Sequence, residues 1–312
     1  MIDTRKVAVI GCGFVGSACA FTLMQHGLFS EMVLIDLDKA RAEGEAMDIS
    51  HGLLFAKPMN IYAGTYADAA DADIAIVTAG ANQKPGETRL DLVRKNSKIL
   101  ISILEELKKC NFGGILLVVS NPVDILTRVA QKYSGLPEGR VFGSGTVLDT
   151  ARLKYLLGEH LSVDSRGVHA FIIGEHGDSE IAVWSSANVS GVPMHQFCEM
   201  RGFYDHDNAM REIGENVKNS AYAIIERKGA TYYGIAMAVQ RICEAVVRDE
   251  KSILPVSAAL HGEFGIDDAT LSVPSVLGAN GVEKVVPISL SETELTRLRY
   301  SADMLKGIFA EL

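Results

Sequence analysis

A glycine-rich turn at the end of the first apolar segment constrains the fold of this chain more than any other feature. Residues 6–10 form a short apolar run, and Gly11, Gly13 and Gly16 follow it before a segment of helical length. Glycines spaced Gly-x-Gly-x-x-Gly permit a tight strand-to-helix turn and a close approach of the backbone to a pyrophosphate. Taken alone, the same glycines would equally suit a purely structural turn.

Strand-length apolar segments alternate with helix-length segments through the first half of the chain. Further runs typical of buried parallel strands lie at residues 32–36, 74–78 and 115–120. Residues 89–110 have helical periodicity, with an apolar stripe of Leu92, Ile99, Ile103 and Leu107. This βαβ order predicts an α/β fold with a doubly wound, Rossmann-type parallel sheet.

The pattern changes after about residue 145. A strand is predicted at residues 168–173, and a long amphipathic helix at residues 207–228 should end at Gly229. Its inward residues are predicted to be Met210, Ile213, Val217 and Ile224.

The C-terminal third adds β-rich runs and a last helix. The runs lie at residues 253–258, 271–276 and 284–288. Ser291, with Glu294 three residues later, predicts a capping box that opens the final helix. Because 312 residues exceed the usual size of one hydrophobic core, we predict two domains. These are residues 1–145, with the doubly wound sheet, and residues 146–312, of mixed α+β type.

Composition argues against several classes of partner. A formal net charge of −9 disfavours binding to nucleic acid and to acidic lipid. The five cysteines are odd in number and form no Cys-x-x-Cys pair, so we expect reduced thiols and no metal site. No apolar run is long enough for a membrane span, and the first strand begins too soon after Met1 for a leader peptide. We therefore expect a cytoplasmic protein.

Asp36 turns the glycine motif into a more specific prediction. It ends the second predicted strand, twenty residues after Gly16, where a carboxylate can accept hydrogen bonds from the adenosine ribose. A carboxylate there would also repel a 2′-phosphate, so NAD is favoured over NADP. The alternative is that Asp36 only caps the next helix.

Side chains suited to proton transfer and anion binding follow later strands. The third and fourth strands end near Gly80 and Asn121, at the sheet edge where such folds bind ligands. His176 follows an apolar strand between glycines, and an imidazole can exchange a proton near neutral pH. Asp149 and Arg152 share one helix face, so one could orient an imidazole while the other binds a carboxylate. The alternatives are a turn residue at Asn121, a structural histidine at His176 and a simple intrahelical ion pair.

Motifs along essentially the whole chain resemble those of the lactate/malate dehydrogenase family, in the family's order. They lie at residues 11–16, 79–89, 121–124, 143–146, 148–152 and 174–178. The resemblance implies an NAD-dependent oxidoreductase that moves a hydride between NADH and pyruvate to give (S)-lactate, the last step of lactic fermentation.

The resemblance also implies a role for each matched residue. His176 would donate a proton to pyruvate, and Asp149 would hold its other ring nitrogen. Arg152 would bind the substrate carboxylate as a bidentate pair, and Arg89 would polarise the ketone oxygen from a stretch similar to the family's closing loop. Asn121 would add a hydrogen bond to that oxygen. A non-enzymatic NAD-binding protein should have lost this set.

Further matched positions would line the substrate pocket and the NAD site. Thr231 would lie near the substrate methyl group. The NAD site would comprise Gly11, Gly13, Val15, Gly16, Asp36, Arg41, Tyr66, Gly80, Ala81, Ser102, Val119, Ser120, Asn121 and Ser144.

Gln83 favours lactate over malate. The family's malate enzymes carry arginine at this position to balance a second substrate carboxylate, whereas an amide offers no charge. A dehydrogenase for malate or for a longer 2-hydroxy acid stays open as the alternative.

Two positions bear on regulation. Many bacterial members of the family are activated by fructose 1,6-bisphosphate, which an arginine and a histidine bind between subunits. This chain has His169 at the histidine position and Lys154 at the arginine position. The lysine ammonium is a point charge and lacks the two-pronged geometry with which arginine binds a phosphate. Alternatively, His169 is an ordinary sheet residue and Lys154 is a solvated charge on a helix. The resemblance also implies a homotetramer.

Overall fold

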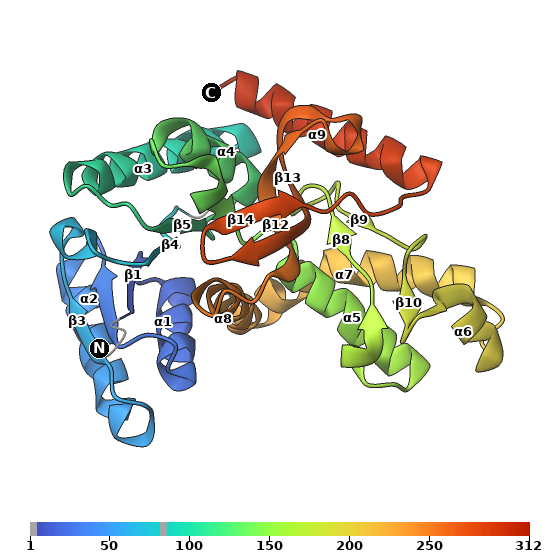
Figure 1. Ribbon diagram of the computed structural model, residues 1–312, viewed down its shortest axis with the longest axis horizontal. Coiled ribbons are helices and arrows are strands. Elements are labelled where there is room, and N and C mark those ends of the chain that lie inside the picture. Colours follow the sequence, from blue (N-terminus) through green and yellow to red (C-terminus); the bar gives the residue numbers. More distant parts are fainter. Residues whose placement is uncertain (1–4, 82–85) are drawn as a thin grey trace.

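The computed structural model describes residues 5–81 and 86–312. Within these residues nine strands form one sheet in the order β14-β13-β12-β6-β5-β4-β1-β2-β3 (Figure 1). The parallel strands are β1 (Lys6–Ile10), β2 (Glu31–Ile35), β3 (Asn60–Ala63), β4 (Ile74–Val77), β5 (Ile115–Val118) and β6 (Val141–Gly143). The predicted doubly wound sheet is therefore confirmed.

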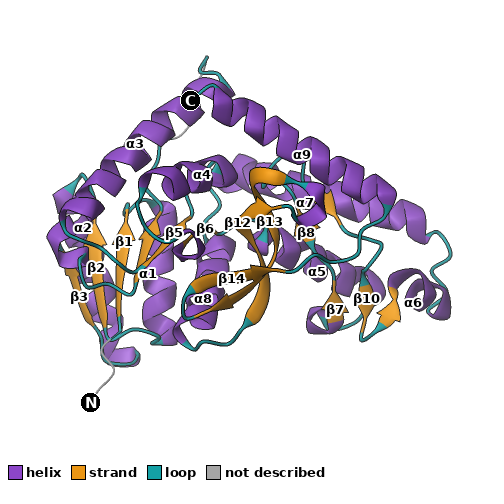
Figure 2. Cartoon of the chain, turned by 45° about the horizontal axis from the view of Figure 1, so that its top comes forward, coloured by secondary structure: helices purple, strands orange, loops and turns teal. Residues whose placement is uncertain are grey.

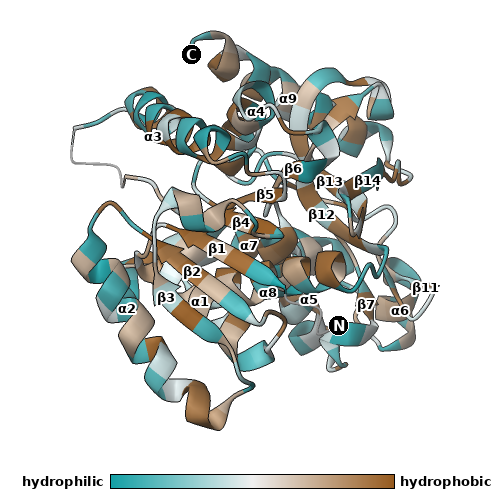
Figure 3. Ribbon diagram, turned by 60° about the vertical axis from the view of Figure 1, so that its left-hand side comes forward, coloured by the Kyte–Doolittle hydropathy of each residue, from teal (hydrophilic) through white to brown (hydrophobic). Residues whose placement is uncertain are grey.

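Successive residues of β1 point to opposite faces of the sheet, and each face is covered by helices. Val7 and Val9 belong to the core beneath α1 (Phe14–His26), α2 (Lys39–His51) and α8 (Tyr233–Val247). Ala8 and Ile10 belong to the core beneath α3 (Arg89–Lys109) and α4 (Val123–Tyr133). Figure 2 shows the helices on the two sides, and Figure 3 shows β1, β2 and β4 as mainly hydrophobic. The two-sided burial explains why these strands read as continuous apolar runs.

The strand order places a ligand-binding edge beside β1. From β1 the chain builds outward to β2 and β3, then returns to add β4, β5 and β6 on the other side. The loops after β1 and β4 therefore leave towards opposite faces of the sheet, and folds of this kind bind ligands at that point, at the carboxyl ends of the strands.

The second half extends the same sheet and adds smaller sheets. The antiparallel strands β12 (Ser252–His261), β13 (Asp267–Gly278) and β14 (Gly281–Val285) join it beside β6. Hydrogen bonding thus continues across the domain boundary proposed near residue 145. The other elements are α5 (Val147–Leu161), β7 (Val168–His169), β8 (Ile172–Ile173), β9 (Ile181–Ala182), β10 (Asn188–Val189), β11 (Val192–Pro193), α6 (Met194–Met200), α7 (His206–Lys228) and α9 (Glu292–Ala310).

Local predictions in the second half hold with two corrections. The strand predicted at 168–173 is split into β7 and β8, which join different sheets. In α7, Met210, Ile213 and Val217 are buried and Gly229 ends the helix with φ of 82°, whereas Ile224 is only partly buried. Ser291 and Glu294 form the predicted capping box of α9.

The stripe predicted for α3 is confirmed in part, since Ile103 and Leu107 are buried. Leu92 and Ile99 are only partly buried, because the helix faces the core through Val93, Asn96 and Leu100 instead. Apolar periodicity alone could not anticipate that a polar residue, Asn96, lies on the buried side. Among the helices that the structure describes, none has the length and apolar character needed to cross a membrane.

Candidate active site

The glycine turn after β1 leaves room for a phosphate group. A Cβ atom at Gly16 would lie 1.8 Å from the Gly11 carbonyl oxygen, so only glycine lets α1 start this close to β1. A Cβ at Gly13, the N-cap residue of α1, would meet nothing within 4 Å. The start of α1 is therefore an open helix N-terminus, which suits an anionic pyrophosphate.

Asp36 lies beside this turn and is not a helix cap. Its Oδ2 accepts a hydrogen bond of 2.6 Å from the Cys12 backbone N–H, and its Oδ1 accepts one from Asp38. Asp38, not Asp36, caps α2 by accepting from the Arg41 N–H. The capping alternative for Asp36 is therefore wrong, and its carboxylate lies beside the glycine turn, at the carboxyl end of β2.

Several other predicted NAD-site residues meet at the carboxyl ends of β4, β5 and β6. The Ser120 hydroxyl donates to the Ala79 carbonyl at 2.6 Å, which ties the end of β5 to the loop carrying Gly80. The Ser144 backbone N–H donates to Val118 at 2.8 Å. Val119 is buried beside them. These contacts gather the predicted residues at the edge that the strand order opens.

The remaining predicted NAD-site residues lie on helices that flank the sheet. Val15 is in the first turn of α1, and Arg41 is exposed in the first turn of α2. Tyr66 is partly buried, and burial, Glu106 and Asp36 together raise its pKa. Ser102 is exposed on α3, where its hydroxyl donates to Ile99 of its own helix.

His176, Asp149 and Arg152 form one connected cluster. The Nδ1 atom of His176 lies 2.5 Å from Oδ2 of Asp149, and Arg152 donates to the other Asp149 oxygen at 2.7 Å. The Asp149 side chain is only 3% exposed, whereas those of Arg152 and His176 are 13% and 27% exposed. The acid is therefore buried behind two cationic groups that remain accessible.

This contact sets the charge of the imidazole. Burial alone would lower the pKa of His176, but the charge and the hydrogen bond of Asp149 outweigh burial and raise the pKa to about 9. Burial likewise opposes ionisation of Asp149, but His176 and Arg152 lower its pKa. The cluster therefore holds an imidazolium and a carboxylate at neutral pH.

Asp124 anchors the backbone of the histidine loop, a role that the sequence did not predict. Its Oδ2 accepts from the His176 backbone N–H at 2.7 Å, and its Oδ1 accepts from the hydroxyls of Ser257 and Ser272 at 2.6 and 2.9 Å. Asp124 is 2% exposed, in the first turn of α4. An acid inside the apolar segment after Asn121-Pro122 is a sequence sign of a buried carboxylate. Its partners could not be predicted, because Ser257 and Ser272 lie on distant strands.

Arg89 lies at the start of α3 and contacts the two acids that flank His176. It forms an ion pair with Glu175, and its Nη1 lies 3.4 Å from Oδ2 of Asp178. The Arg89 side chain is 46% exposed, so it reaches the histidine loop from the solvent side. The structure thus brings Arg89 to the neighbourhood of His176, although the role predicted for it concerns a substrate oxygen.

Asn121 lies in the loop after β5, and Thr231 lies between α7 and α8. The Asn121 carbonyl accepts from the Asn96 amide at 2.9 Å, and the same Asn96 bonds both backbone groups of Ala81. Asn96 thereby couples the loops after β4 and β5, and sequence reasoning missed it. Thr231 precedes Tyr232, whose ring stacks on Phe14 at the glycine turn with centroids 5.4 Å apart.

Two groups of predicted residues stand apart from this cluster. Gln83, on which the choice of substrate was argued, lies outside the described residues. Lys154 is partly buried on α5 and His169 is exposed on β7, which packs against α5. Within the described residues, no hydrogen bond or ion pair joins Lys154 to His169.

Comparisons with known proteins agree with this geometry. Residues 5–143 match the family model for the lactate/malate dehydrogenase NAD binding domain, and residues 146–312 match that for the alpha/beta C-terminal domain. The chain is 53% identical to an L-lactate dehydrogenase of Acetivibrio thermocellus, over 99% of this chain and 97% of the relative. It is 54% identical to one of Priestia megaterium, over 97% and 95% respectively.

Solved structures give the same result. The minor L-lactate dehydrogenase of Enterococcus mundtii in its ligands-bound form superimposes with a TM-score of 0.96 at 43% identity, covering 99% of this chain and 98% of that one. A lactate dehydrogenase from a Medee basin deep-sea metagenome library gives 0.95 at 44% identity, covering 98% of both chains. The chain belongs to the lactate/malate dehydrogenase family.

Proposed function

We propose that this protein is an NAD-dependent L-lactate dehydrogenase, which reduces pyruvate to (S)-lactate and catalyses the reverse reaction. The observation that carries the proposal is Asp149, a buried carboxylate that bonds an imidazole on one side and a guanidinium on the other. A 2-oxo acid needs this pair of cations, one to protonate its ketone and one to hold its carboxylate.

Each residue has a distinct part in the proposed reaction. Arg152 binds the substrate carboxylate with two parallel hydrogen bonds and so fixes the orientation of the ketone. His176 donates the proton from its Nε2 atom to the ketone oxygen, because Nδ1 is engaged by Asp149. NADH, when bound, supplies the hydride that adds to the substrate C2 atom.

Charge develops on the ketone oxygen as the hydride adds. Arg89 and Asn121 stabilise it, Arg89 after leaving the acids that flank His176. Asp149 stays ionised throughout and prevents the imidazolium from losing its proton to solvent before the reaction. In the reverse direction the neutral imidazole accepts the proton of the lactate hydroxyl.

The neutral amide of Gln83 supports pyruvate rather than oxaloacetate as the substrate. An unpaired second carboxylate in the closed site would cost several kcal/mol, which corresponds to a preference of roughly a thousandfold. The test compares kcat/KM for pyruvate, oxaloacetate and longer 2-oxo acids with NADH. Faster reduction of oxaloacetate than of pyruvate would make this a malate dehydrogenase and overturn the proposal.

We further propose a cytoplasmic homotetramer that fructose 1,6-bisphosphate activates through Lys154 and His169. Burial lowers the pKa of Lys154, so a bound phosphate would stabilise its charged form. His169 is exposed on the neighbouring strand. Sedimentation and pyruvate saturation curves with and without millimolar bisphosphate test this, and unchanged curves and size would refute activation.

A further inference from the structure

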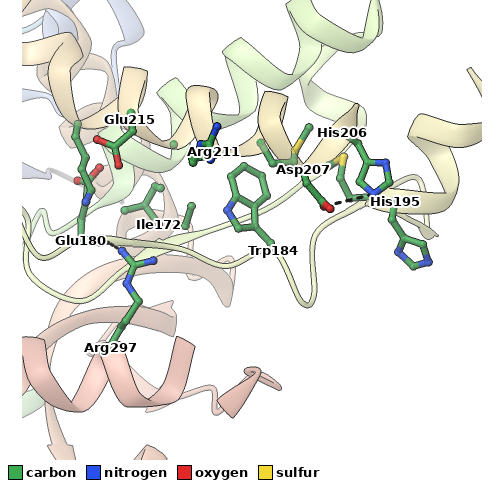
Figure 4. A pocket seen from close by; sticks show the side chains of 14 residues that line it. Ile172, Glu180, Trp184, His195, His206, Asp207, Arg211, Glu215 and Arg297 are labelled. Atoms are coloured by element: carbon green, nitrogen blue, oxygen red, sulfur yellow. Dashed lines mark hydrogen bonds and ion pairs between the residues drawn. The ribbon is translucent and has the colours of Figure 1, made fainter. Parts of the chain in front are cut away.

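A cavity of about 350 Å³ lies behind the catalytic cluster. It is lined by α6 and α7, by β8 and β9 with the residues after them, and by Arg297 of α9. Figure 4 shows Glu180 and Glu215 at one end of the cavity, Trp184 in the middle, and His195 and His206 at the other end. Of the described residues that line this cavity, none has a part in the proposed reaction. Glu180 links the cavity to that site, because it also lies beside His176 and Asp149.

Glu180 is a buried acid with an incomplete set of hydrogen bonds. It is only 3% exposed, and its Oε1 atom has no hydrogen-bond partner in the described part of the chain. Its backbone is held firmly, since its N–H donates to Gly177 at 3.1 Å and its carbonyl accepts from Arg297 at 3.3 Å. A buried carboxyl oxygen without a partner is costly and calls for a functional explanation.

The carboxyl group of Glu180 lies next to the catalytic pair. One carboxylate oxygen of Glu180, one of Asp149 and one ring nitrogen of His176 all lie within 4.8 Å of one another. Both oxygens of Asp149 are already engaged, one by His176 and the other by Arg152. Glu180 is therefore a second acid beside the imidazole, close enough to act on its charge but outside the hydrogen-bonded pair.

Charged groups from several elements determine when Glu180 ionises. Burial raises its pKa to about 8, and the negative charge of Asp149 acts in the same direction. His176, Lys218 of α7 and Arg152 of α5 oppose this increase. The other titratable groups around the cavity and the histidine loop are Asp124 of α4, Arg89 of α3, Glu175 and Asp178 beside His176, His195 of α6, His206, Asp207, Arg211 and Glu215 of α7, and Arg297 of α9.

We propose that Glu180 is a positioning residue that keeps the proton on His176 in alkaline solution. Near neutral pH its carboxyl group is protonated and adds no charge. As the pH rises, Glu180 loses its proton to water in the cavity, and its new negative charge then adds to that of Asp149 beside the imidazolium. His176 consequently stays protonated to a higher pH than Asp149 alone would secure.

The test is the pH dependence of kcat/KM for pyruvate in Glu180→Gln, and it rests on the proposed function. Near neutral pH the variant should resemble the wild type, because glutamine mimics the protonated acid. Its alkaline limb should move about half a pH unit or more to lower pH, an additional loss of roughly threefold at about pH 9.5. Glu215→Gln removes an exposed acid from the same cavity and should leave the limb in place.

A second measurement does not depend on catalysis. In protein labelled with ¹³C-histidine, the His176 signal is assigned by its absence from His176→Asn and then titrated by NMR. Its midpoint should be lower in Glu180→Gln than in the wild type, and Glu180→Asp should restore part of the difference. If Glu180→Gln fails to fold, Glu180→Ala takes its place, because water from the cavity can fill the space that the side chain leaves.

The two measurements separate the two proposals. Equal His176 midpoints in the wild type and in the glutamine variant would overturn the role of Glu180. A lower midpoint in a protein that does not reduce pyruvate would support the role of Glu180 and refute the proposed function instead.

Discussion

The imidazole of His176 meets the carboxylate of Asp149 at 2.5 Å, although the two residues are 27 positions apart in the chain. His176 follows β8, and Asp149 lies in the first turn of α5. Their contact gives the ring both its orientation and its positive charge, since one ring nitrogen is occupied and the other is left for a substrate.

The pH dependence of the two reaction directions should be opposite. The pKa of His176 is raised to about 9 from its ordinary value, so the proton donor is present below that pH and lost above it. For pyruvate reduction, kcat/KM should be level near neutral pH and decline above about pH 9. For lactate oxidation it should rise towards the same pH, and steady-state kinetics in both directions will show whether one group governs both.

Replacing Asp149 with asparagine should reduce turnover strongly. The amide keeps the size of the side chain but removes the charge that holds the imidazolium, so the pKa of His176 should fall and kcat decrease about a hundredfold or more. Asp164→Asn is a suitable control, because Asp164 pairs with Arg166 at the protein surface. Stopped-flow measurement of NADH oxidation gives both rates, and similar kcat values would contradict the role of Asp149.

Arg152→Lys tests carboxylate binding. Lysine keeps the positive charge but loses the planar fork that matches a carboxylate, so the expected loss in kcat/KM for pyruvate is about 10- to 100-fold. NADH affinity, measured by fluorescence titration, should stay unchanged because the role proposed for Arg152 is to bind the substrate and not the cofactor. Weaker NADH binding with unchanged kcat/KM would assign Arg152 to the cofactor.

Asp124→Ala should affect stability as well as activity. It leaves the hydroxyls of Ser257 and Ser272 and the His176 N–H without their acceptor in a buried site. We expect a loss of about 3 kcal/mol or more in the free energy of unfolding, measured by urea denaturation. The kcat should fall too, since the histidine loop loses its anchor. Full stability in this variant would show that water or another group replaces the carboxylate.

Asp36→Ala should weaken NADH binding and relax the preference for NADH over NADPH. The carboxylate that would accept from the adenosine ribose, and would repel a 2′-phosphate, is gone. Asp38→Ala removes the helix cap two residues later and serves as the control. The Kd values of both variants for NADH and NADPH are measured by fluorescence titration. Equal changes in Kd for the two variants would mean that Asp36 acts only on the local fold.

Parts of the fold and site were predictable because they depend on short-range pattern. The strand at residues 6–10, the helix beginning at residue 89 and the capping box of Ser291 with Glu294 agree with the structure. The motifs also predicted that His176, Asp149 and Arg152 share one site, and the three side chains are in contact. The burial of Asn96 and the separation of β7 from β8 were missed, since both depend on partners that local periodicity does not specify.

By itself the sequence determined where strands and helices begin, which turn could accept a phosphate, and which side chains could exchange a proton. These properties arise from residues within a few positions of each other. Only the tertiary structure decided that Asp124 bonds both the His176 backbone and Ser272, 148 positions away, and that Glu180 lies beside His176 and Asp149. Such contacts depend on the register of distant strands and on burial, which change both the partners and the charge of an acid.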